Sequence, residues 1–380
     1  MESMRTTLRR GRNVWNRVNM PEGEFRQRVE KIRSEMKKED IDVLLVYGDA
    51  WIDYSDPCYI TNYYPGMVGS IALVPRKGEV GLIFWGSARG IEYTQDITWI
   101  KEIKPASNVA STCVDYLKQA GLFPSTLGLA GFKQLMPYQQ LQSFYTAING
   151  CKTVDAGHFI RDMRMVKSSR ERDQIHRAAL ILTGVFEALD RRAPEDMNEL
   201  TLDAALDREA RLGGAEDVRQ LYALPQETDW TFRPVEDRQM ASGDTIIIYL
   251  AAEFERYWAE IIRTFKVETS GLMEVRSEKL DDIYRRVTKL LTPGKATSKF
   301  YGEVEKEVRK SGAFIPEYGL GEGIGLSVSE PPLVCREDTN NFREGMCLTL
   351  RLAMKDDNEG AIMTGNTIYL SADGPEVFTR

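Results

Sequence analysis

The sequence predicts a two-domain protein, with an α/β domain over residues 1–157 and an α+β domain over residues 158–380. A chain of 380 residues is longer than one hydrophobic core usually supports, so two domains are expected. In the first part of the chain, short apolar runs alternate with segments of helical periodicity, which is the pattern of an α/β domain. In the second part, long amphipathic helices alternate with long strand-like segments, which favours helices packed on a curved antiparallel sheet.

The N-terminal domain is expected to begin with a helix, because apolar residues recur at helical spacing from Phe25 to Met36. The run at 41–47, which is apolar except for Asp42, is typical of a buried strand. A Pro-Arg-Lys-Gly turn at 75–78 separates the next two strands. The expected elements after the first helix and strand are strands at 70–74, 80–85, 127–130 and 152–154, and a helix over 109–117.

A capping box opens the C-terminal domain, since Ser168 and Glu171 stand three residues apart in front of a long amphipathic segment. The apolar stripe of this helix runs from Ile175 to Leu189. A second helix is expected to stop at Gly213, where two glycines follow each other. The expected helices after the first are at 198–212, 278–291 and 301–310, and the expected strands are at 245–251, 257–267, 347–352 and 367–370.

Charge and composition exclude several classes of partner. The net charge of −7 and the scattered basic residues argue against a nucleic-acid surface. No stretch approaches 18 uninterrupted apolar residues, so no membrane span is expected. A short basic arm from Arg5 to Arg12 lacks the apolar core of a signal peptide and is expected to be a flexible or partner-contacting tail. These features together predict a cytoplasmic protein.

Cysteine and histidine usage limits the chemistry that the chain can perform. The five cysteines are far apart and contain no C-x-x-C pair, so neither a disulfide framework nor a zinc knuckle is indicated. The chain has only two histidines, His158 and His176, for which we expect structural roles. This scarcity argues against a Ser-His-Asp or Cys-His relay and against a multi-histidine metal site.

Three segments carry a likeness to a known family. They are Val-Asp at 154–155 with Ile-Arg-Asp-Met-Arg-Met-Val-Lys-Ser at 160–168, Gly-Asp-Thr to Arg-Thr-Phe over 243–265, and Gly-Glu-Gly-Ile-Gly-Leu at 321–326. The third segment is followed by Glu330-Pro331, Gly345-Met346 and Asp373-Gly374. In this order and at these separations they resemble the creatinase, prolidase and aminopeptidase P family. The resemblance covers roughly residues 20–380 and implies the pita-bread fold for the C-terminal domain.

The resemblance also implies the positions of a metal site. In metal-using members, two aspartates, a histidine and two glutamates hold two divalent ions, and the matching residues here are Tyr249, Glu260, Glu322, Arg351 and Gly365. Two carboxylates and one guanidinium leave a single net negative charge to face two divalent cations. A buried arginine at such a position repels a cation. The sequence therefore predicts no metal, and it indicates no other cofactor.

The leading hypothesis is a metal-independent hydrolase of a small polar compound with a C–N bond, such as an amide, an amidine or a cyclic amidine. Either Glu260 or Glu322 activates water, and the other carboxylate or Tyr249 protonates the leaving nitrogen. Arg351 binds one carboxylate of the pair or an anionic group of the substrate. Creatinase, which has this fold and hydrolyses its substrate without a metal, supports this class by resemblance.

Further substrate contacts are expected around these groups. Tyr257 and Trp258 lie between the two hairpin positions and can form an aromatic wall. Ser329 stands in a loop next to Glu330, where loop residues often bind substrate. Trp51 follows the first strand, at a loop that closes the pocket of a neighbouring subunit in relatives. The resemblance therefore implies a homodimer.

Two alternatives stay open. A metal-free lyase that abstracts a proton next to a carboxylate needs the same Glu, Arg and Tyr side chains. The second alternative is a non-catalytic domain that binds a ligand or a peptide, because the family's fold also serves that role in eukaryotic chaperone factors. In the leading hypothesis the partner is a small-molecule substrate, with no nucleic acid and no membrane.

Overall fold

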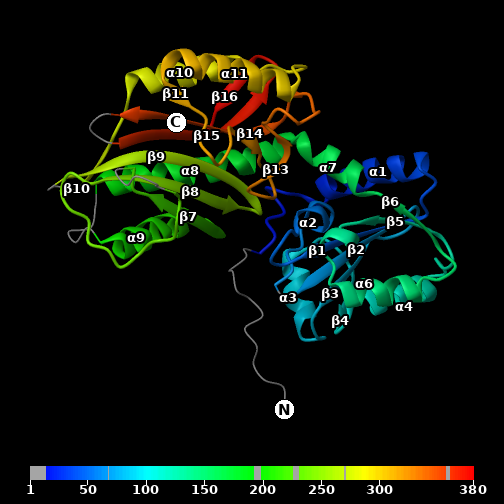
Figure 1. Cartoon of the computed structure of the whole chain (residues 1–380). Coiled ribbons are helices and arrows are strands. Elements are labelled where there is room, and N and C mark those ends of the chain that lie inside the picture. Colours follow the sequence, from blue (N-terminus) through cyan, green and yellow to red (C-terminus); the bar gives the residue numbers. More distant parts are fainter. Residues whose placement is uncertain (1–13, 67, 192–197, 226–230, 269–270, 357–359) are drawn as a thin grey trace. The chain divides into compact units, whose positions relative to one another are not determined.

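A computed structural model describes the chain except for residues 1–13, 67, 192–197, 226–230, 269–270 and 357–359. The chain divides into two compact units, Met1–Arg164 and Met165–Arg380 (Figure 1). Each unit has its own hydrophobic core. The basic arm that the sequence indicates near the N-terminus lies outside the described residues. None of the described helices is long and apolar enough to cross a membrane.

The division between the units falls near the end of helix α7 (Gly157–Met165), whereas the sequence places the boundary at the start of this helix. The helix is bound to the first unit by an ion pair of Arg164 and a side-chain hydrogen bond of His158. The Nη1 atom of Arg164 lies 2.6 Å from Oδ1 of Asp56, and Nε2 of His158 lies 2.8 Å from Oε1 of Glu39. His158 therefore has a structural contact, as the sequence analysis expects.

The N-terminal unit is a mixed sheet with helices packed against it. The strands are β1 (Val43–Asp49), β2 (Gly69–Pro75), β3 (Gly81–Trp85), β4 (Glu102–Ala106), β5 (Thr126–Ala130) and β6 (Lys152–Asp155). The helices are α1 (Glu22–Lys38), α2 (Ser55–Thr61), α3 (Gly90–Ile97), α4 (Val109–Gln119), α5 (Phe132–Leu135) and α6 (Tyr138–Ala147).

The strand order in this sheet is β4-β3-β2-β1-β5-β6, with β1 antiparallel to β2 and parallel to β5. Residues of β1 such as Leu45 pack with Val114 of α4 and Phe132 of α5 in one buried cluster. The α/β class predicted for this part of the chain is confirmed. Strand β4 is not predicted, because its residues, Glu-Ile-Lys-Pro-Ala, form no apolar run.

The C-terminal unit is built on one large antiparallel sheet. Its strands are β7 (Asp217–Ala223), β8 (Thr245–Phe254), β9 (Tyr257–Glu268), β10 (Gly271–Glu274), β11 (Ala313–Phe314), β12 (Glu322–Gly323), β13 (Glu330–Leu333), β14 (Cys347–Asp356), β15 (Gly360–Ser371) and β16 (Gly374–Val377). Its helices are α8 (Ser169–Arg191), α9 (Glu199–Leu212), α10 (Glu278–Lys289) and α11 (Thr297–Ser311). The order along the main path of the sheet is β13-β12-β14-β15-β9-β8-β7.

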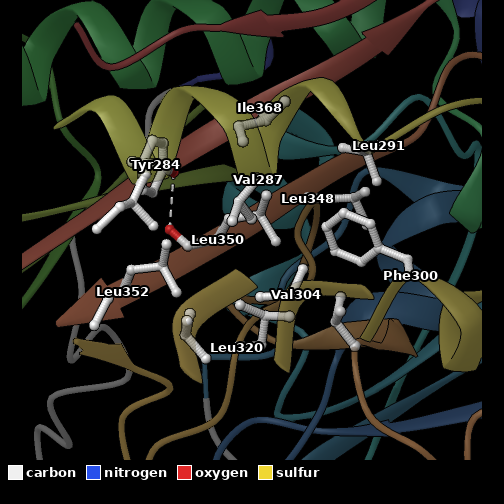
Figure 2. Close-up of a cluster of buried hydrophobic side chains, with 14 of the residues drawn as sticks. Tyr284, Val287, Leu291, Phe300, Val304, Leu320, Leu348, Leu350, Leu352 and Ile368 are labelled. Carbon is white, nitrogen blue, oxygen red and sulfur yellow. Dashed lines mark hydrogen bonds between the residues drawn. The ribbon is translucent and has the colours of Figure 1, made fainter. Parts of the chain in front are cut away.

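Helices cover one face of this sheet. In β14, Leu348, Leu350 and Leu352 point into the core beneath α10 and α11, and the hydroxyl of Tyr284 donates to the carbonyl of Leu350 at 3.0 Å (Figure 2). Because successive side chains of a strand alternate, Arg351 points to the other side. We call that side the Arg351 face. The α+β class predicted for this part of the chain is confirmed.

Candidate active site

Strand pairing brings the predicted residues to one face of the sheet. Arg351 on β14 is paired with Gly365 on β15, and Gly365 is paired with Ile262 on β9. Ile262 is in turn paired with Tyr249 on β8. Paired residues point to the same side of a sheet, and Glu260 shares that side because it lies two residues from Ile262. Tyr249, Glu260 and Arg351 therefore all lie on the Arg351 face.

The guanidinium of Arg351 lies between two carboxylates. Its Nε and Nη2 atoms donate to the two oxygens of Glu260 at 2.8 and 2.9 Å. Its Nη2 and Nη1 atoms donate to the two oxygens of Glu322 at 2.6 and 3.2 Å, and Nη1 also donates to the carbonyl of Tyr318 at 3.3 Å. A guanidinium has five N–H donors, so every donor of Arg351 is engaged. We call Glu260, Arg351 and Glu322 the ion triad.

The two carboxylates of the ion triad differ in exposure. The side chain of Glu260 is fully buried, whereas the side chain of Glu322 is 15% exposed. Burial raises the pKa of Glu322 above its ordinary value of 4.5, although the positive charge of Arg351 acts in the opposite direction. Burial lowers the pKa of Arg351, but the two carboxylates outweigh burial and raise it, so the arginine stays charged.

Tyr249 extends the ion triad with a hydroxyl that stays protonated at neutral pH. This hydroxyl is hydrogen-bonded to Glu260, and burial together with the negative charge of Glu260 raises its pKa well above 10. The ring of Phe232 lies 6.1 Å from the ring of Tyr249 and 4.9 Å from the ring of Tyr318. The peptide N–H of Phe232 donates to the hydroxyl of Tyr318 at 2.5 Å. Sequence reasoning missed Tyr318, which no motif marks.

A glycine lets Glu322 reach Arg351. A Cβ atom on Gly321 would lie 1.8 Å from the carbonyl oxygen of Thr349, so only glycine permits this approach of the two chain segments. The peptide N–H of Glu322 then donates to the hydroxyl of Thr349 at 3.3 Å. This contact holds the short strand β12 beside β14. It brings the Glu322 carboxylate to the guanidinium.

The fifth position of the predicted site, Gly365, also lies on the Arg351 face. A Cβ atom there would lie 3.0 Å from both Cδ1 and Cγ1 of Ile262. A glutamate at this position would therefore displace Ile262, which fills the space opposite the glycine.

The two aromatic residues predicted to form a wall lie on opposite faces. Trp258 is fully buried and lies on the Arg351 face, two residues from Glu260. Tyr257 points to the helix-covered face, where its hydroxyl donates to Oε1 of Glu171 at 3.1 Å. The prediction that Tyr257 contacts the substrate is therefore wrong, because adjacent residues of a strand point to opposite sides.

The other two predicted contacts are not joined to the ion triad by the described geometry. Ser329 is exposed in the loop before β13, and β13 pairs with β12, the strand that carries Glu322. Trp51 belongs to the N-terminal unit, is 59% exposed, and its peptide N–H donates to Asp49 at 2.8 Å. Both residues stay proposed substrate contacts.

Known proteins resemble this chain along most of its length. Residues 173–372 match metallopeptidase family M24, and residues 28–166 match the creatinase/prolidase N-terminal domain. The Xaa-Pro dipeptidase of Pyrococcus horikoshii is 25% identical over 374 residues, covering 93% of this chain and 97% of the relative. The uncharacterised peptidase YqhT of Bacillus subtilis is 20% identical and covers 93% of this chain and 98% of its own.

Solved structures share the fold. The prolidase from Pyrococcus horikoshii superposes with a TM-score of 0.75 at 22% identity, covering 93% of this chain and 98% of that chain. The X-Pro aminopeptidase from Thermotoga maritima gives a TM-score of 0.77 at 19% identity, covering 93% and 97%. The N-terminal domain of the FACT complex subunit SPT16 from chickpea gives 0.68 at 16% identity, covering 94% and 96%.

The M24 match spans more than half of the 380 residues, and the N-terminal match accounts for most of the rest. These findings confirm the resemblance on which the sequence analysis rests. The chain belongs to metallopeptidase family M24, with a creatinase/prolidase N-terminal domain followed by a pita-bread domain.

Proposed function

We propose that this protein is a hydrolase that works without a metal ion on a small polar compound with a C–N bond, such as an amide, an amidine or a cyclic amidine. Its relatives include Xaa-Pro dipeptidases, whose substrates contain an amide bond, and this supports the reaction class. The observation that carries the proposal is the ion triad. Arg351 lies between two carboxylates, and one of these carboxylates, Glu322, stays partly exposed.

The side chains at the five expected ligand positions do not fit a pair of divalent cations. Nitrogen atoms of Arg351 lie 2.8 Å from Glu260 and 2.6 Å from Glu322, in the space that a cation shared by these carboxylates would occupy. A cation bound there would lie beside a buried positive charge. Within the described residues, no group of three or more His, Cys, Asp or Glu side chains is arranged to hold an ion. The proposed mechanism therefore uses protein side chains.

Glu322 is the proposed general base. It is the more exposed carboxylate of the ion triad, and its raised pKa makes it a stronger base than an ordinary glutamate. In the proposed reaction, the carboxylate takes a proton from water while the water oxygen forms a bond to the carbon of the C–N group. The same proton then passes from Glu322 to the leaving nitrogen as the C–N bond breaks, which restores the carboxylate.

The other groups of the site orient the general base and stabilise the charge that develops on the substrate. Arg351 holds both carboxylates through paired hydrogen bonds and so fixes the direction from which Glu322 reaches the water. As negative charge develops on the substrate, the Tyr249 hydroxyl exchanges its hydrogen bond to Glu260 for one to the substrate. Glu260 then keeps its two bonds to Arg351 and stays satisfied in its buried position.

The variant Glu322→Gln tests the proposal. Amine or ammonia release is measured on a panel of small amides, amidines and cyclic amidines, in the presence of a strong chelator. The wild-type protein is expected to turn over a member of the panel, and the variant to lose about 100- to 10,000-fold in kcat, the usual contribution of a general base. Glu317→Gln, the same change at an exposed glutamate in the same loop region, is the control and is expected to retain full activity.

Two results would overturn the proposal. Turnover that chelation abolishes and Mn²⁺ restores would show that a metal performs the chemistry. Full turnover by a well-folded Glu322→Gln protein would remove the general base from the mechanism.

A further inference from the structure

Arg219 lies on the Arg351 face, although no motif of the sequence marks it. It is paired with Ala251 across β7 and β8, and Ala251 is paired with Glu260 across β8 and β9. Side chains paired in this way point to the same side of the sheet. Two strand spacings separate the backbones of Arg219 and Glu260, which is about 10 Å. A small molecule can span this distance.

The guanidinium of Arg219 is held by an aromatic ring instead of an acid. Its central carbon lies 4.7 Å from the centroid of the fully buried Trp258 ring. The side chain of Arg219 is exposed, and no described residue accepts a hydrogen bond from it or pairs with it as an acid. A guanidinium that lies over a rigid ring and has no acidic partner keeps its N–H fork available for a ligand.

Arg351 is not available for the same task. All five of its donors are engaged by Glu260, Glu322 and Tyr318, so binding a substrate anion would break the ion triad. The ion triad also has one more negative than positive charge, and it repels an anionic ligand. Arg219 supplies the balancing charge, and its positive charge also acts on Tyr249, where it opposes the rise in pKa.

We propose that Arg219 binds a carboxylate of the substrate, and that the protein therefore acts on a carboxylic acid that also carries the C–N group. The N–H fork of an arginine matches the two oxygens of a carboxylate. The carboxylate lies against the exposed guanidinium of Arg219, and the carbon to be attacked lies toward Tyr249 and Glu322. This inference rests on the proposed function, because it requires that the Arg351 face receives the substrate.

The test measures binding without turnover. The probes are N-acetylglycine, N-acetylproline and a six-membered cyclic amidine carboxylate, each compared with its neutral primary amide. Dissociation constants are measured by calorimetry on the Glu322→Gln protein, which prevents consumption of the probes. At least one acid is expected to bind roughly 10- to 100-fold more tightly than its amide, the usual effect of a charged hydrogen bond.

Arg219→Gln in the same background is expected to lose this preference for the acid, and Arg219→Lys to recover only part of it, because lysine keeps the charge but lacks the planar fork. Arg309→Gln is the matched control, since Arg309 is an exposed arginine of helix α11, which covers the opposite face. The preference is expected to be unchanged in this control.

A preference for the acid that persists in Arg219→Gln would overturn the inference, and so would a protein that prefers none of the three acids. These outcomes are distinct from failure of the proposed function. Binding of an acid that depends on Arg219, without turnover by the wild-type protein, would leave the carboxylate site in place and refute the hydrolase. Turnover by the wild-type protein that does not depend on Arg219 would support the hydrolase and refute the carboxylate site.

Discussion

At the scale of single residues, Arg351 determines the charge and the hydrogen bonding of the site. The resemblance places it where metal-using relatives carry a carboxylate, and the structure shows its five donors divided among Glu260, Glu322 and Tyr318. The guanidinium of Arg351 is therefore the cation that lies between the two carboxylates. This arrangement satisfies Glu260, which is fully buried and which no solvent molecule can compensate.

Replacing Arg351 by methionine is expected to destabilise the protein strongly. The fully buried Glu260 and the partly exposed Glu322 would lose their cation, and breaking a buried pair from one side costs about 3–5 kcal/mol. Arg351→Glu is expected to cost more, because it adds a third carboxylate. Urea unfolding at neutral pH measures both changes, with Arg309→Met as the exposed control, which is expected to change the free energy of unfolding by less than about 0.5 kcal/mol. Equal stability of Arg351→Met and the control would contradict the account.

The pKa of Glu322 gives a prediction about pH. Because burial raises this pKa in the folded state, the folded protein holds the proton more tightly than the unfolded chain does. The stability that Glu322 contributes is fully present below its ordinary pKa of 4.5 and is lost as the pH rises through the folded value. The free energy of unfolding of the wild type minus that of Glu322→Gln is therefore expected to fall from about pH 4 to about pH 7. A difference that rises with pH would mean that the charge of Arg351 lowers the pKa of Glu322 by more than burial raises it.

At the scale of elements, the β8–β9 hairpin positions Tyr249, Trp258 and Glu260 together. Its turn contains Glu255 and Arg256, and both have a positive φ, at 49° and 71°. Non-glycine residues rarely adopt this conformation, so the turn needs support from its surroundings. The support comes from the residue just before β7. The peptide N–H and the Nη1 atom of Arg256 each donate to an oxygen of the Glu216 carboxylate at 2.9 Å, and both side chains are fully buried.

The hairpin gives a prediction with an internal control. Arg256→Met would remove this buried cation from the Glu216 carboxylate, and we expect a loss of about 3–5 kcal/mol in the free energy of unfolding. Arg276→Met removes the arginine of an exposed pair with Glu274 in the same unit, where the arginine side chain is 74% exposed, and is expected to cost less than about 1 kcal/mol. Urea unfolding distinguishes the two. A small effect of Arg256→Met would show that the turn does not depend on this pair.

At the scale of the whole molecule, we predict a homodimer with two-fold symmetry. The family resemblance implies pairing through the C-terminal units, with the loop that contains Trp51 near the site of the partner. Light scattering at micromolar concentration is expected to give twice the mass of the chain, and a biological interface should bury more than about 1,000 Å². A monomer under these conditions would refute the dimer and would also remove the reason for assigning Trp51 to the substrate.

Periodicity in the sequence was sufficient to predict most of the large elements. The apolar run at 41–47 became β1, and the capping box of Ser168 and Glu171 stands at the start of α8, where the peptide N–H of each residue is bound by the side chain of the other. Strand β7 was not predicted, because polar residues interrupt its sequence, Asp-Val-Arg-Gln-Leu-Tyr-Ala, and leave no long apolar run. The two-residue strand β12 is too short to leave any pattern.

The sequence by itself indicated the family, five candidate positions of the site and a local charge that argues against a pair of divalent cations, since these predictions follow from residue types and their spacing. Only the tertiary structure decided which side chains face the site and keep hydrogen-bond donors for a substrate. Tyr257 turned away from the site because strands alternate, and Arg351 gave all its donors to neighbours that are distant in sequence. Arg219 came to the Arg351 face for a similar reason, because strand pairing joins residues that local sequence cannot connect.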